Sequence, residues 1–201
     1  MYSIGSGDIK MLMTKNKETK TYKSFLAKFF GIEQIKYNAL ASPIDQLRTG
    51  AILEQMYYRT LSIVWGAQEK VQCKELPVLT VSLDFALVEN SKVIEFEELK
   101  TIDFFKLMDM QSECIDCNYI KKKHKDYYYQ IQSQLLATDL KNATLTFLAV
   151  YTYDDIKNKT REVKENELMK IKIPRDEEVI DEVKKALIIF QQIKEYMECN
   201  Q

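Results

Sequence analysis

Two acidic residues and a lysine stand in a pattern suited to hydrolysis of a phosphodiester bond. Glu98 and Lys100 end an apolar stretch and are two residues apart, so on a strand they share one face. Asp84 belongs to the preceding stretch and would lie across from 97–98 once the chain turns back. Hard divalent cations prefer carboxylate ligands, and a neighbouring lysine can orient water and balance charge. We therefore expect Asp84, Glu98 and the carbonyl oxygen of Leu99, whose side chain faces away, to bind Mg²⁺ or Mn²⁺.

The acid-x-lysine spacing alone has little value in this chain, because it recurs at six other places. Most of these must be exposed charges on polar faces. Glu98-Leu99-Lys100 differs in context, since it ends an apolar strand, follows a turn and has an aspartate at a matching position on the partner strand. The other triplets begin at Asp8, Glu18, Asp139, Asp155, Glu162 and Glu182.

The composition predicts one globular domain over residues 1–201. The chain is 46% hydrophobic and 29% charged, with 5 Gly and 3 Pro, which leaves no linker to explain. We expect no signal peptide and no membrane span, and hence a cytoplasmic protein. The net charge is −1, so any contact with DNA must be local rather than spread over the whole surface.

Hydrophobic spacing predicts helices and strands in an alternating order. A long helix should begin at Ser42-Pro43, carry Glu54 and end before Gly66. A strand, a polar turn at 89–92 and a returning strand should span 76–100. The stretch 103–118 is either helical or irregular. Further helices are expected at 9–13, 22–30, 126–140 and from 174 to about 199, with strands at 143–153 and 167–173. This order indicates a mixed sheet flanked by helices, an α/β or α+β fold.

Two further segments carry a resemblance to a known family. In the predicted long helix, Arg48 to Glu54 places a glycine, Gly50, four residues before an acidic residue. A later helix has an aromatic-rich run, Tyr128 to Leu135, that contains Gln130. With Asp84, Glu98 and Lys100 in the same order along the chain, the sequence resembles the phage lambda-type, YqaJ-like recombination exonucleases of the PD-(D/E)XK superfamily. Leu83 stands where the superfamily has its proline, and fourteen residues separate Asp84 from Glu98.

The resemblance implies a restriction-endonuclease-like core and a metal-dependent exonuclease. Such an enzyme would digest one strand of linear duplex DNA from its 5′ end and leave 3′ single-stranded tails for recombination or repair. Glu54 would join the metal ligands, Lys100 would orient the attacking water, and Gln130 would position water or the phosphate. Phosphate contacts would come from Ser6, from Arg48 and from a basic run at 121–125. The lysines that begin this run are Lys121, Lys122 and Lys123.

Partners and location also follow from the resemblance. They are double-stranded DNA ends, a single-strand annealing protein and two further copies in a homotrimer, in the cytoplasm of a bacterial or phage-infected cell. Two alternatives stay open: a structure-specific or restriction-type endonuclease on the same fold, and an inactive DNA-binding subunit. The intact Asp84, Glu98 and Lys100 set argues against the second.

A basic run and a pair of cysteines each have a structural explanation as well as a functional one. The basic run 121–125 is typical of a solvated loop, although it would also suit phosphate contacts. His124, the single histidine, is expected to belong to that loop rather than to act as a general base. Cys114 and Cys117 have metal-ligand spacing, but no second pair follows, so we expect reduced thiols rather than a structural metal or cluster.

Overall fold

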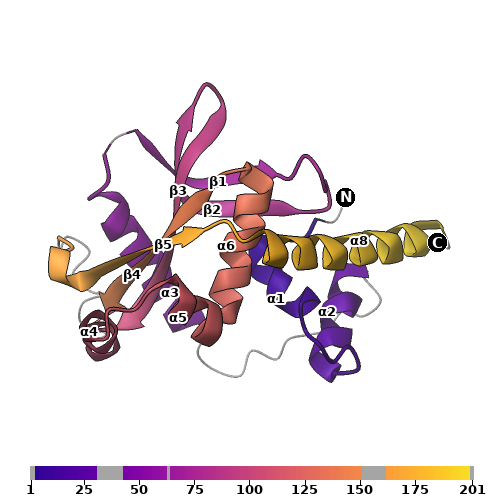
Figure 1. Ribbon diagram of the computed structural model, residues 1–201, viewed down its shortest axis with the longest axis horizontal. Helices are drawn as coiled ribbons and strands as arrows, with labels where there is room; N and C mark the ends of the chain where they lie inside the picture. Colours follow the sequence, from indigo (N-terminus) through magenta and orange to yellow (C-terminus); the bar gives the residue numbers. More distant parts are fainter. Residues whose placement is uncertain (1–2, 31–42, 63, 151–161, 200–201) are drawn as a thin grey trace.

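A five-stranded mixed sheet forms the centre of the protein, as a computed structural model that describes residues 3–30, 43–62, 64–150 and 162–199 shows (Figure 1). The strands follow one another across the sheet in chain order. They pair antiparallel, except that β3 and β4 run parallel. The strands are β1 (Trp65–Gln72), β2 (Thr80–Glu89), β3 (Lys92–Asp103), β4 (Asn142–Val150) and β5 (Leu168–Pro174).

Strands β2 and β3 pair near the hairpin turn and then separate. Their last antiparallel pair is Phe85 with Glu97. Beyond this pair, β2 continues against β1 as far as Thr80, whereas β3 continues against β4 as far as Asp103. The sheet therefore forks in its middle, and Asp84 and Glu98 are the first residues past the fork.

Three helices that pack against one another cover one face of the sheet. Helix α6 (Lys125–Thr138) contacts β1, β2 and β4, and it packs against α1 (Ile9–Leu12) and α8 (Glu177–Cys199). Figure 1 shows α8 extending outward from the sheet toward the C-terminus. Phe96, Leu145 and Phe147 belong to the large apolar cluster on this face. Burial of this cluster is the main contribution to the stability of the fold.

Helix α3 (Pro43–Tyr58) covers the other face. Leu53 and Tyr57 pack there with Phe85, Leu99 and Leu148 in a second, smaller cluster. Residues that are neighbours on β3, such as Glu98 and Leu99, thus point to opposite layers, as the two-residue period of a strand requires.

Two short helices connect β3 to the parallel strand β4 before α6. They are α4 (Phe104–Ser112) and α5 (Cys117–Lys123). Each begins at an aspartate that accepts hydrogen bonds from two backbone N–H groups of its first turn: Asp103 for α4 and Asp116 for α5. The remaining helical segments are η1 (Ser6–Asp8), α2 (Lys20–Phe30) and η2 (Glu165–Glu167).

The structure confirms the expected mixed α/β sheet and corrects several elements. The long helix ends at Tyr58 rather than near 65, and 65–72 forms strand β1, which was not predicted. This segment is polar and lies at the sheet edge, so it lacks the apolar alternation of a half-buried strand. The predicted strand 143–153 extends to Val150, and 151–153 lie outside the described residues.

The basic run was also expected in a loop, but Lys121, Lys122 and Lys123 form the last turn of helix α5. The Asp116 cap starts this helix, and positive charge at a helix C-terminus is favoured by the helix dipole. In the described part of the chain, none of the helices has the length and apolar character needed to cross a bilayer.

Candidate active site

The fork between β2 and β3 places the two acidic residues of the predicted hairpin motif side by side. Asp84 and Glu98 directly follow the last strand pair, Phe85 with Glu97. The carboxylate of Asp84 accepts a hydrogen bond from the backbone N–H of Leu99, with an N–O distance of 2.9 Å. Asp84 thus satisfies a donor of β3 that has no β2 backbone opposite it. The predicted proximity of Asp84 to 97–98 is confirmed.

Glu98 is 1% exposed and its carboxylate is surrounded by hydrogen-bond donors. Lys100 Nζ lies 2.5 Å from Oε1, and Gln130 Nε2 lies 2.6 Å from the same oxygen. Gln134 Nε2 donates to Oε2 at 2.6 Å and also contacts the carbonyl oxygen of Ser82. The two glutamines are one turn apart on α6, so this helix presents both amides to one carboxylate.

Burial and mutual repulsion determine the protonation of this pair. Burial, followed by the negative charge of Asp84, raises the pKa of Glu98 to about 7. Burial also raises the pKa of Asp84, despite the N–H bond from Leu99 and the charge of Lys100. The Lys100 pKa is raised because Glu98 and Asp84 outweigh the desolvation that would lower it. Lys100 therefore stays charged beside two carboxylates that favour a further proton or cation.

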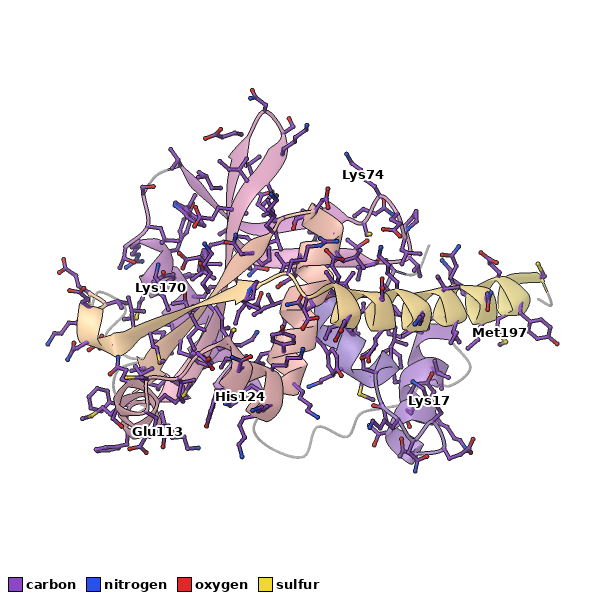
Figure 2. The ribbon with its side chains drawn as sticks, viewed as in Figure 1. Lys17, Lys74, Glu113, His124, Lys170 and Met197 are labelled. Carbon is purple, nitrogen blue, oxygen red and sulfur yellow. The ribbon has the colours of Figure 1, made fainter. Side chains whose placement is uncertain are left out.

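The ammonium group of Lys100 also contacts an aromatic side chain. It lies 5.4 Å from the ring centroid of Tyr127, the third residue of α6. The Tyr127 ring in turn stacks on His124 with an interplanar angle of 2°. Figure 2 labels His124, which lies where α5 meets α6. His124 thus packs against Tyr127, and the expectation that it is not a general base stays a prediction.

Glu54 approaches this centre from helix α3. Its Oε1 accepts a hydrogen bond from Gln68 Nε2 at 2.6 Å, and the same amide nitrogen lies 3.5 Å from Asp84 Oδ1. Burial raises the pKa of Glu54, and the charge of Asp84 adds to this effect. The structure therefore brings Glu54, Asp84, Glu98, Lys100 and Gln130 together, as the sequence predicted.

A pocket of about 440 Å³ borders Asp84 and Gln130. Its walls come from the N-terminal turn, from β1, from the β2 arm of the fork and from α6, and Ser6 is a buried member of the turn. The predicted phosphate contact Ser6 thus lies at the same pocket as Asp84 and Gln130. The lining residues are Ser3, Gly5, Ser6, Gly7, Gln68, Lys70, Thr80, Val81, Ser82, Asp84 and Gln130.

The other predicted phosphate contacts lie elsewhere. Lys121 forms an ion pair with Asp176 at 2.6 Å, and Lys122 and Lys123 are exposed on α5. None of these three lysines lines the pocket. Arg48 belongs to α3, but its side chain lies outside the described residues. Cys114 and Cys117 form no disulfide in the described part of the chain.

The side chains at the fork carry oxygen atoms of the kind that a hard divalent cation prefers as ligands. Asp84, Glu98 and Glu54 supply carboxylates, and the side-chain oxygen of Gln134 is buried without a hydrogen-bond partner. Across 3–30, 43–62, 64–150 and 162–199, however, no group of three or more acidic, histidine or cysteine side chains is arranged to hold a metal ion. Amide and ammonium donors contact the carboxylates instead. The ligand role of the Leu99 carbonyl stays a prediction.

Sequence reasoning did not single out Gln68 or Gln134 as site residues. Gln134 carried a usable signal, because it follows Gln130 by one helical turn and shares its face. Gln68 carried none, since the strand that presents it was not predicted.

Solved structures with a similar backbone exist, although no family model and no curated protein matches the sequence. The alkaline exonuclease of Laribacter hongkongensis matches with a TM-score of 0.64 and 13% identity, over 98% of this chain and 90% of its own. Its complex with dAMP gives a TM-score of 0.65 and 12% identity, over 98% and 90%. A phage-related exonuclease from Haemophilus somnus 129PT matches with a TM-score of 0.58 and 17% identity, over 92% and 90%. The resemblance inferred from the sequence is confirmed at the level of architecture: this chain has the α/β fold of these exonucleases.

Proposed function

We propose that this protein is a metal-dependent deoxyribonuclease that digests one strand of linear duplex DNA from an end. The observation that carries the proposal is the environment of Glu98. This fully buried carboxylate bonds to Lys100 and lies beside Asp84, which lines the pocket, although burying charge is costly without a purpose or partner. Such perturbed groups beside a pocket are typical of catalytic sites.

Each residue of the fork has a role in this proposal. Asp84, Glu98, Glu54 and the Leu99 carbonyl would hold Mg²⁺ or Mn²⁺, which supplies a positive charge to polarise the phosphate and lower the pKa of water. Lys100, charged and 2.5 Å from Glu98, orients the attacking water. Gln130 reaches both Glu98 and the pocket, so its amide can hold the water or a phosphate oxygen in place.

Action on DNA ends is supported by two observations. The three solved structures compared above are described as exonucleases, and one was crystallised with dAMP, a mononucleotide. In this chain, the N-terminal turn forms part of the pocket wall next to Asp84, which suits a site that receives a strand terminus. Digestion from the 5′ end, with 3′ tails left for recombination, is part of the proposal by resemblance.

Partners follow the same reasoning. Double-stranded DNA ends are the proposed substrate, and Lys122 and Lys123 are free to contact phosphates along the duplex, since they are exposed on α5. A homotrimer around the DNA, cooperation with a single-strand annealing protein and a cytoplasmic location are proposed on resemblance to the family alone.

Digestion of linear and closed circular duplexes tests the proposal. In Mg²⁺, the wild-type protein is expected to release nucleotides from a linear duplex and to leave a covalently closed circle intact. Loss of a 5′ label before a 3′ label would support the proposed direction. Cleavage of the circle would indicate an endonuclease, and no cleavage in Mg²⁺ or Mn²⁺ would indicate a DNA-binding subunit.

A further inference from the structure

Gln68 holds a central position between the acidic residues of the fork. It lies on β1 between the pairs Ala67–Phe85 and Glu69–Leu83, and therefore opposite Asp84. Its amide nitrogen is 2.6 Å from Glu54 and 3.5 Å from Asp84, while its amide oxygen accepts a hydrogen bond from Ser82 at 3.1 Å. Ionised carboxylates only accept hydrogen bonds, so the amide is oriented with its nitrogen toward them.

The backbone of Gln68 adopts a conformation that glutamine rarely takes. Its φ is 57°, in the left-handed region that disfavours residues with a Cβ. The other described non-glycine residues with positive φ lie outside helices and strands: Asn90 and Ser91 in the hairpin turn, and Cys114 and Asp139 after helices. Gln68 is thus the exception inside a strand, and strain of this kind is concentrated at functional sites.

The amide competes with a cation for the same oxygen atoms. A cation bound by both Glu54 and Asp84 would have to occupy the space that the Gln68 nitrogen now fills between them. Gln68 is exposed and borders the pocket, so its side chain has room to move away.

We propose that Gln68 is a placeholder for the cation: its amide links Glu54 to Asp84 in the cation-free protein and withdraws when the cation binds. The inference rests on the proposed function, because it takes these carboxylates as the cation site. Gln68 is therefore a positioning residue. It limits the repulsion between two acidic groups until the charge that neutralises them arrives.

Calorimetric titration of the DNA-free protein with Mn²⁺ tests the proposal. Gln68→Gly removes the amide and also relieves the left-handed strain, so the variant is expected to fold. It should bind Mn²⁺ about fivefold more tightly than the wild type, because no hydrogen bond has to be broken first. Gln68→Asn, which tolerates positive φ but is one methylene shorter, should fall between the two.

Gln72→Ala is the matched control. Gln72 lies on the same strand, but its amide donates to the Pro77 carbonyl at 3.0 Å, outside the pocket. This variant should bind Mn²⁺ as the wild type does. Equal or weaker Mn²⁺ binding by Gln68→Gly would overturn the inference. Failure of the proposed function is distinguishable, since the wild type would then digest no DNA, whereas failure of the inference alone leaves digestion intact.

Discussion

Glu97 and Glu98 are consecutive residues of β3 that are buried on opposite faces of the sheet, each paired with its own lysine. Glu97 Oε1 lies 2.8 Å from Lys170 Nζ, and Glu98 Oε1 lies 2.5 Å from Lys100 Nζ. Figure 2 labels Lys170, which lies on β5. Tyr57 and Thr146 also donate to Glu97, so its carboxylate is fully engaged on the α3 face. We therefore expect Glu97 to contribute to stability and Glu98 to the proposed chemistry.

The bond between Tyr57 and Glu97 should stabilise the fold. Tyr57→Phe removes a hydroxyl that donates to a buried carboxylate at 2.6 Å and keeps the ring packed on Phe85. We expect the free energy of unfolding in urea to fall by about 1.5–3 kcal/mol, as for other hydrogen bonds to charged groups. Tyr58→Phe is the control, since that exposed hydroxyl donates to the Trp65 carbonyl and its loss should cost less than about 0.5 kcal/mol. Equal losses in the two variants would contradict this assignment.

The stability of the cation-free protein should depend on pH through Glu98. Its pKa is about 7 in the folded protein, against an ordinary value of 4.5, so the folded protein holds an extra proton between these values. The free energy of unfolding should therefore fall as pH rises from about 4.5 to about 7. Melting temperatures in EDTA measure this trend, which Glu98→Gln should flatten. Added Mn²⁺ should restore more stability at pH 8 than at pH 6, because protons compete with the cation. A flat wild-type profile would contradict the buried acidic pair.

The hydrogen bond from Gln134 should lower the pKa of the Glu98 carboxylate. The Gln134 amide donates to Glu98 and lowers the Glu98 pKa, against the larger effect of burial. Gln134→Leu should therefore move the acidic limb of the pH–rate profile to higher pH. Gln132→Leu is the control on the same helix, because the Gln132 amide bonds to Pro174 and Asp176 instead. A shift in the Gln132 variant, or none in the Gln134 variant, would contradict this role.

The exposed lysines of α5 should contribute to DNA binding without affecting catalysis. Replacing Lys122 and Lys123 by alanine should reduce the slope of log K against log salt by about 1.8, because each phosphate that a lysine neutralises on a duplex accounts for about 0.9. Binding of an end-containing duplex at several salt concentrations measures this slope. Lys121→Ala differs, since Lys121 pairs with Asp176, and its effect should appear in stability. An unchanged slope in the double variant would place the DNA away from α5.

The parts of the fold that the sequence predicted are those with strong local signals. Alternating apolar residues marked β2 and β3, and the position of Asp84 relative to Glu98 followed from the hairpin register. Strand β1 escaped prediction because it is a polar edge strand, and with it Gln68 was missed. The strand period predicts that Glu97 and Glu98 face opposite layers, but it does not predict which helix covers which face. That arrangement arises from packing of distant segments and leaves no trace in local spacing.

The most direct test of the active site compares Lys100 with a lysine in the same sequence pattern elsewhere. Lys141 follows Asp139 as Lys100 follows Glu98, but Lys141 is exposed, whereas Lys100 forms an ion pair with the buried Glu98. The measurement is the rate of nucleotide release from a linear duplex in Mg²⁺ by the wild type, Lys100→Ala and Lys141→Ala, with thermal melting to confirm folding. We expect Lys100→Ala to be slower by about 10²–10⁴-fold and Lys141→Ala to match the wild type. A folded Lys100→Ala variant that digests DNA at the wild-type rate would contradict the assignment of the fork as the catalytic centre.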